Sequence, residues 1–226
     1  MKYVERGSKG SLKFLLGREQ VDALLVATNQ GPQVYSASGT FFFHPSMAVL
    51  RAQRLKKYEP DHFVAALELK PGMKVLDCTM GLASDAIVAS FITGGEGVVC
   101  AVEASPLLHF VVSEGLKNYQ AEDIDLNSAM RRITTVCAEA ETYLAALPAD
   151  SFDVVYFDPM FRIPVNGSSN MEPLRPLAWE KALTVETVEA ALRAAPCVVI
   201  KERGQKLLEA FGCTEIVGGR YSRVKY

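Results

Sequence analysis

The segment Val75-Leu76-Asp77-Cys78-Thr79-Met80-Gly81-Leu82-Ala83-Ser84-Asp85-Ala86 decides the fold, because it predicts a buried strand, a tight turn and a helix start in direct succession. Small residues at Thr79, Gly81 and Ala83 let the backbone turn sharply and approach a ligand closely. The helix that follows begins with free backbone N–H groups, which favour a polar or anionic ligand there. A plain turn between strand and helix is the alternative interpretation.

Outward from this segment, short β-branched runs alternate with helical stretches to the end of the chain. Such an alternation predicts a parallel sheet with helices on both faces. Gly218-Gly219 joins the last two strands without a helix, so the final strand should run antiparallel. We therefore expect an α/β fold over residues 61–226, with a doubly wound, mostly parallel seven-stranded sheet. Its strands are expected at 74–78, 98–103, 133–137, 152–157, 197–201, 214–217 and 220–226, and its helices at 84–92, 105–119, 139–146, 184–194 and 205–211.

Residues 1–60 have a different pattern and are expected to form a small N-terminal extension. This extension holds nine Lys/Arg against four Asp/Glu, whereas residues 61–226 hold 15 against 22. We call residues 1–60 the basic front and residues 61–226 the acidic body. A basic front joined to an acidic body indicates an anionic partner, although a solvated basic face explains the charge equally well. We expect short strands at 11–16, 23–28 and 34–36, an apolar run at 40–43, and a basic helix at 44–58 that carries Arg51, Arg54, Lys56 and Lys57; a second helix at 61–69 would open the body, with Asp61 as its N-cap.

Composition narrows the class of protein further. The 226 residues are 49% apolar and 22% charged, which is typical of a soluble globular protein with a sizeable core. No run approaches the roughly 20 apolar residues of a membrane helix, and the first residues lack the apolar run of a signal peptide. The five cysteines are widely spaced and odd in number, so we expect reduced thiols and a cytoplasmic location. The three histidines share no spacing with the cysteines that indicates a metal site.

Two further strand ends carry candidate binding residues. The strand expected at 98–103 ends in Glu103, and an acid at this place in such sheets accepts hydrogen bonds from ribose hydroxyls. A nicotinamide-dependent oxidoreductase would use the same acid, but its G-x-G-x-x-G turn is absent, since the turn contains only Gly81. Glu139 and Ala140 follow the next strand, where they would flank an adenine ring. An exposed strand-end acid and an ordinary helix start are the alternatives.

The strand expected at 152–157 runs into Asp158-Pro159-Met160-Phe161, the most specific motif in the chain. One chemistry that this motif would suit is reaction at an exocyclic amine of a nucleic-acid base. Such an amine is a poor nucleophile, and acceptors at its N–H groups direct its lone pair and gain strength as positive charge develops. The Asp158 carboxylate and the Pro159 carbonyl each offer one such acceptor, and proline fixes the direction of its carbonyl. Phe161 offers a face on which a base can stack. A turn-forming Asp-Pro beside a core phenylalanine is the alternative.

These motifs resemble two known patterns. D-x-T-x-G-x-x-x-D-A at 77–86 resembles the S-adenosylmethionine loop of class I methyltransferases, and D-P-M-F at 158–161 resembles the [N/D/S]-P-P-[Y/F] motif of amino-group methyltransferases. Together with 198–201 and 221–226, they are similar to the small-subunit ribosomal RNA guanine-N2 methyltransferase family, the RsmJ-like group, over roughly 45–226. The chain departs from that family at Ser84 and Ala104, where the family usually has arginine, and at Arg162, where it usually has proline.

The resemblance implies S-adenosyl-L-methionine as cofactor, the N2 amine of a guanine in ribosomal RNA as substrate, and neither a metal nor a membrane. A methyltransferase for another planar amine, in DNA, protein or a small molecule, stays open, as does a non-catalytic RNA-binding module. Lys201 is interpreted either as a phosphate contact or as a solvated strand end. The expected catalytic residues are Asp158, Pro159 and Phe161, and the expected cofactor contacts are Asp77, Thr79, Gly81, Ser84, Asp85, Glu103, Ala104, Glu139, Ala140 and Asp158.

Overall fold

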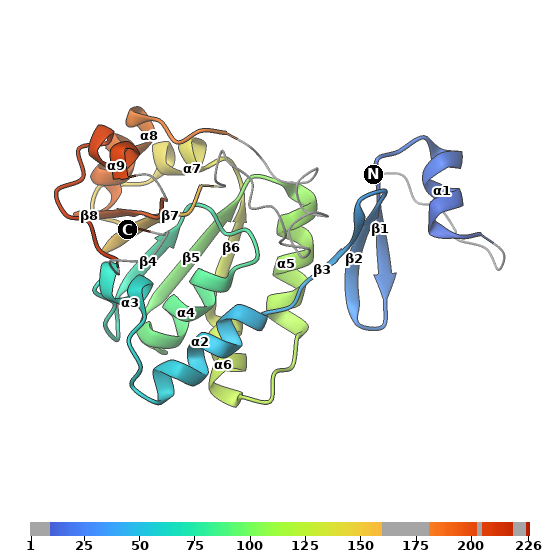
Figure 1. The fold of residues 1–226 in the computed structure, drawn as a ribbon, viewed down its shortest axis with the longest axis horizontal. Coiled ribbons are helices and arrows are strands. Elements are labelled where there is room, and N and C mark those ends of the chain that lie inside the picture. The colour runs from blue at the N-terminus through green and yellow to red at the C-terminus, as the bar shows by residue number, and fades with distance from the viewer. Residues whose placement is uncertain (1–9, 160–180, 203–204, 219–224) are drawn as a thin grey trace.

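Strand β4 (Lys74–Asp77) lies at the centre of a five-stranded parallel sheet in the computed structural model, which describes residues 10–159, 181–202, 205–218 and 225–226 (Figure 1). The strand order is β6-β5-β4-β7-β8. Because β5 pairs with one side of β4 and β7 with the other, the direction of winding reverses between β4 and β7. The remaining strands are β5 (Val98–Glu103), β6 (Thr134–Cys137), β7 (Val154–Phe157) and β8 (Cys197–Ile200).

Helices cover both faces of this sheet, as the alternation of elements predicts. Alternate residues of β4 and β7 point into two separate cores: Val75 and Tyr156 into one, Leu76 and Phe157 into the other. Since the central strands are buried on both sides, β7 is apolar along its whole length, and β4 and β5 are apolar except at their ends. The first core is covered by α2 (Ser46–Lys56), α3 (His62–Ala66), α4 (Ser84–Thr93), α5 (Pro106–Asn118) and α6 (Ile124–Arg132), the second by α7 (Ala140–Ala146), α8 (Val185–Ala194) and α9 (Gln205–Ala210).

Local sequence explains how several helices begin. Ser105 caps α5 through its side chain, with Pro106 in the first turn, and Asp61 caps α3 by accepting from two backbone N–H groups. Helix α4 begins differently, because its N-cap Ala83 is fully buried and adopts a left-handed conformation with φ 59°. Only a small side chain fits there, which explains the alanine. Helix α6, capped by Asp123, was not expected from the sequence.

The N-terminal residues form a small three-stranded antiparallel sheet of β1 (Ala23–Thr28), β2 (Gly31–Ser36) and β3 (Gly39–Phe42). This sheet lies beside α5 (Figure 1). The strand expected at 11–16 is wrong, because helix α1 (Leu12–Glu19) occupies this segment. The Ser11 side chain caps it, and apolar residues three and four apart fit a helix better than a strand.

The end of the chain departs from the expected seven strands. Residues 214–217 form no regular strand, although two backbone hydrogen bonds of 2.8 and 2.9 Å join Val217 and Tyr226. An isolated antiparallel bridge joins Glu202, which follows β8, to Lys225. Most of the strand expected at 220–226 lies outside the described residues. Within the described ranges, no helix combines the length and apolar character that crossing a membrane requires.

Candidate active site

A pocket of about 400 Å³ opens at the carboxyl ends of β4, β5 and β7, where the winding of the sheet reverses. Ligands of open α/β sheets bind at this place. The structure brings nearly all of the residues expected at the site into the lining of this one pocket, and Phe161 lies outside the described residues. The expected residues in the lining are Asp77, Thr79, Gly81, Ser84, Asp85, Glu103, Ala104, Glu139, Ala140, Asp158 and Pro159.

The turn after β4 is fixed by hydrogen bonds to its neighbours. Asp77 Oδ1 accepts from the Thr79 backbone N–H at 2.9 Å, and the Thr79 hydroxyl accepts from the Asp158 backbone N–H at 2.7 Å. Gly81 has φ 48°, a left-handed backbone conformation that glycine adopts without steric strain, and it lines the pocket. Thr79 therefore ties the ends of β4 and β7 together.

Glu103 is held by backbone groups. Its two carboxylate oxygens accept from the Gly81 N–H at 3.1 Å and the Ser105 N–H at 2.8 Å. Burial raises the pKa of Glu103 above its ordinary value, and these backbone donors oppose that rise. The carboxylate thus lies at a fixed place after β5 while still lining the pocket.

The edge after β6 carries a small ion-pair group. Glu139 is the N-cap residue of α7, and Lys181 Nζ lies 3.2 Å from both the Glu139 and the Glu141 carboxylates. Ala140 begins the helix and leaves space on the pocket side. Lys181 was not expected at the site.

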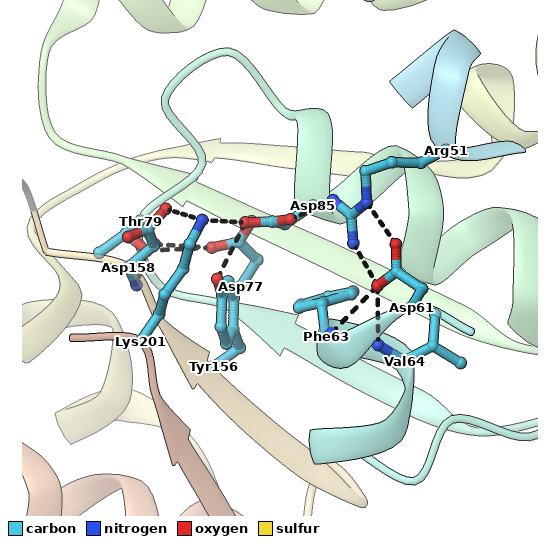
Figure 2. Close-up of polar contacts among 10 residues, drawn as sticks. All are labelled: Arg51, Asp61, Phe63, Val64, Asp77, Thr79, Asp85, Tyr156, Asp158 and Lys201. Carbon is cyan, nitrogen blue, oxygen red and sulfur yellow. Dashed lines mark hydrogen bonds and ion pairs between the residues drawn. The ribbon is translucent and has the colours of Figure 1, made fainter. Parts of the chain in front are cut away.

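The opposite edge of the pocket is a chain of alternating charges (Figure 2). Lys201 Nζ lies 2.7 Å from Asp158 Oδ2 and 3.2 Å from Asp85 Oδ2. Asp85 also accepts from the Tyr156 hydroxyl at 2.9 Å and from the Arg51 guanidinium. Arg51 in turn pairs with the Asp61 carboxylate, 2.7 Å away. This series of paired side chains therefore connects α2, α3, α4, β7 and the end of β8.

Three aspartates of this region show how the number of nearby cations controls ionisation. Burial raises the pKa of Asp77 to about 7, and no side-chain cation among the described residues hydrogen-bonds it. Burial also raises the pKa of Asp158, but the single cation Lys201 limits the value to about 6. For Asp85, the two cations Lys201 and Arg51 outweigh burial, and its pKa falls below the ordinary value.

Sequence reasoning missed the role of two cations. Arg51 was grouped with a basic face for an anionic partner, but its side chain is 16% exposed and pairs inward with Asp61 and Asp85. Lys201, interpreted as a phosphate contact or a solvated strand end, pairs with two carboxylates inside the pocket. The sequence did contain a signal for the pairing of Lys201: this lysine directly follows a buried strand, and acids stand at the ends of two other strands of the same sheet.

The basic front is also neutralised further along α2. Lys56 Nζ lies 2.7 Å from Asp123 and 2.8 Å from Asp125, both of which belong to the acidic body. Part of the charge asymmetry of the sequence is therefore satisfied within the molecule. Arg54 on this helix and Lys57, its C-cap residue, are exposed.

The composition of the pocket fits a cationic ligand with an apolar part. Six carboxylates and three cations line it, together with Met47, Met80, Leu108 and Phe157. A volume of this size is typical of cofactor sites. Among the described residues, no group of three or more His, Cys, Asp or Glu side chains is arranged to hold a metal ion.

Comparison with known proteins gives a consistent family. A family model described as "Putative SAM-dependent methyltransferase" matches residues 36–208. The chain is 38% identical to the uncharacterized protein YpiP of Bacillus subtilis over 208 residues, which cover 91% of this chain and 80% of that protein.

More distant relatives carry a functional name. The chain is 29% identical to ribosomal RNA small subunit methyltransferase J of Dechloromonas aromatica, over 65% of this chain and 60% of that protein. It is 31% identical to the protein of the same name from Rhodopseudomonas palustris, over 57% of this chain and 59% of that protein. The matches thus span about 60% of the length of these two relatives.

A solved structure supports the fold. A SAM-dependent methyltransferase from Neisseria gonorrhoeae superposes with a TM-score of 0.59 at 19% identity, over 80% of this chain and 72% of that chain. At this identity the likeness concerns the arrangement of helices and strands, which agrees with the doubly wound sheet described above.

Proposed function

This chain belongs to the family of S-adenosylmethionine-dependent methyltransferases, and from that premise we propose that it methylates the exocyclic N2 amine of a guanine in small-subunit ribosomal RNA. The observation that carries the proposal is the position of Asp158-Pro159, directly after β7 and across the sheet reversal from the turn after β4. The distant relatives named for ribosomal RNA support the choice of substrate.

The pocket residues fit the cofactor of the family. S-Adenosylmethionine supplies a methyl group on a positively charged sulfur and also carries an ammonium group. The excess of carboxylates in the lining matches these two positive charges. In the proposal, Glu103 accepts from the ribose hydroxyls, and Glu139 with Ala140 lies beside the adenine. Asp77, Thr79, Gly81, Ser84, Asp85 and Ala104 complete the cofactor side of the pocket.

Asp158 and Pro159 form the acceptor side. Asp158 Oδ2 is engaged by Lys201, whereas Oδ1 has no hydrogen-bond partner among the described residues. We assign Oδ1 and the Pro159 carbonyl to the two N–H groups of the target amine, because two acceptors direct the nitrogen lone pair toward the methyl carbon. Phe161 would stack on the base, and it lies outside the described residues.

The proposed transfer conserves atoms and charge. The amine nitrogen forms its bond to the methyl carbon while the carbon–sulfur bond breaks, and the electron pair of that bond stays on sulfur. The nitrogen then carries one proton too many, and that proton passes to the Asp158 carboxylate. A carboxyl whose pKa lies near 6 accepts this proton and returns it to water near neutral pH.

Two measurements test the substrate. Nucleoside mass spectrometry of small-subunit ribosomal RNA, from cells with and without this protein, should show the loss of one N2-methylguanosine. Purified protein should then transfer labelled methyl groups to RNA from the deficient cells and not to RNA from normal cells. An unchanged nucleoside profile, together with transfer to DNA, protein or a small amine, would replace the guanine assignment by another planar amine.

A further inference from the structure

Lys201 is the first residue after β8, and its position is fixed on both sides by backbone hydrogen bonds. Its N–H donates to the Phe157 carbonyl at 2.8 Å, and the next residue, Glu202, exchanges backbone hydrogen bonds of 2.9 and 2.7 Å with Lys225. The ammonium therefore reaches the pocket from an anchored backbone. Its side chain is 19% exposed, so little water competes with its two carboxylate partners.

The two partners of Lys201 have different needs. Asp85 retains Arg51 and the Tyr156 hydroxyl if Lys201 is removed. Asp158 has no second cation among the described residues, and its other side-chain oxygen is unpaired there. Figure 2 shows these contacts, and from them we infer that Lys201 matters more to Asp158 than to Asp85.

Building on the proposed function, we propose that Lys201 is the positioning residue of the acceptor site: it holds Asp158 in the ionised form and turns one oxygen away, so that the other faces the target amine. The Asp158 side chain is 29% exposed, and a half-buried carboxylate without a cation takes up a proton more readily and then cannot accept one from the amine. The 2.7 Å contact to Oδ2 also selects one rotation of the carboxyl group.

The other charged and titratable groups near this pair do not replace Lys201. The neighbouring carboxylates Asp85 and Glu202 oppose the ionisation of Asp158, and Arg51 is engaged by Asp61 and Asp85. The groups that face the pair are Arg51 on α2, Asp77 on β4, Asp85 on α4, Tyr156 on β7, Glu202 just after β8, and Tyr226.

The first test needs no substrate. Carbon-13 NMR on aspartate-labelled protein, with the Asp158 signal assigned through Asp158→Asn, reports the titration of this one carboxyl group. Lys201→Met should raise the pKa of Asp158 by at least about one unit, and Lys201→Arg should leave it near the parental value. Lys117→Met is the matched control, since Lys117 pairs with Glu114 on the surface of α5. An unmoved Asp158 titration in Lys201→Met would overturn the proposal.

The second test follows single-turnover methyl transfer against pH at saturating cofactor. The acidic limb of the profile should move upward in Lys201→Met by the same amount as the Asp158 titration, so that the rate near pH 5 falls about tenfold and recovers at higher pH. A merely structural role would lower the rate equally at every pH, and that outcome would also overturn the proposal. If the parent methylates no guanine, the substrate assignment fails while the NMR titration still decides the role of Lys201.

A second pair of variants covers the case in which Lys201→Met does not fold. Asp85→Asn removes one carboxylate that the missing lysine would leave under-compensated. The double variant Lys201→Met with Asp85→Asn should then show a higher Asp158 pKa than Asp85→Asn alone. Equal values in these two proteins would contradict the proposal.

Discussion

The two edges of the pocket hold their carboxylates by different means. On the edge after β5, the Glu103 oxygens accept from backbone N–H groups, and no side chain in the described part of the structure donates to them. On the edge after β7 and β8, Asp158 and Asp85 depend on the side-chain cations Lys201 and Arg51. Backbone donors are fixed by the fold, whereas cations can be removed one at a time, so the second edge should be the more sensitive to substitution and to pH.

The largest effect is expected at Asp158. Asp158→Ala should lower methyl transfer by about 10²–10³, because in the proposed function it removes a preorganised acceptor that gains strength as the amine becomes charged. Single-turnover rates at saturating cofactor measure this loss, and Asp158→Asn should retain part of the activity through its amide oxygen. Transfer at the parental rate in Asp158→Ala would remove the amine from this edge.

Arg51 tests whether the cations of that edge also stabilise the fold. Arg51→Met leaves Asp61 and Asp85 without a shared partner in a mostly buried place, and the free energy of unfolding should fall by about 3 kcal/mol. Urea denaturation at pH 7 measures the change. Lys56→Met, which breaks an exposed pair on the same helix, is the control and should have little effect. Equal losses in both variants would contradict the contrast between buried and exposed pairs.

Glu103 tests the backbone-held edge. Glu103→Ala should weaken cofactor affinity about ten- to hundredfold, because it removes the acceptor that we propose for the ribose hydroxyls. Calorimetry with S-adenosylmethionine and with its demethylated product should show similar losses, since both ligands carry the same ribose. An unchanged affinity in a folded variant would remove the ribose from this edge.

The smallest expected effect is the pH dependence of cofactor affinity. Asp77 and Asp158 have raised pKa values of about 7 and about 6, so both are partly protonated at pH 5.5 in the free protein. A cationic cofactor favours their ionised forms, and its affinity should therefore rise about tenfold from pH 5.5 to 7.5, with release of protons. Calorimetry in two buffers of different ionisation enthalpy measures both quantities. Asp77→Asn should flatten the dependence, and a flat profile in the parent would show that neither aspartate senses the bound cation.

Local sequence patterns predicted the parts of the molecule that local forces decide. The strands at the centre of the sheet have apolar interiors, and polar residues at or after their carboxyl ends line one pocket. The position of Asp158 at the reversal of the sheet was predictable because the residue directly follows the apolar strand β7.

Contacts between distant segments were not predictable in this way. Lys201 and Asp85 are 116 positions apart, and Arg51 and Asp85 are 34 apart, so no spacing rule connects them. The helix at Leu12–Glu19 was missed because a short apolar segment fits both a strand and a helix. For the end of the chain, glycines indicated a hairpin, but the described residues form only a bridge and two hydrogen bonds there.

The central place of β4 has a consequence for synthesis of the chain. It is the first strand of the parallel sheet to leave the ribosome, and one of its edges stays open until β7 has been made at residues 154–157. At usual translation speeds of about 5–20 residues per second, that interval lasts roughly 4 to 15 s. An open apolar edge can pair with another chain during this time. Slower translation between residues 77 and 154 should therefore lower the yield of folded protein without altering the finished enzyme.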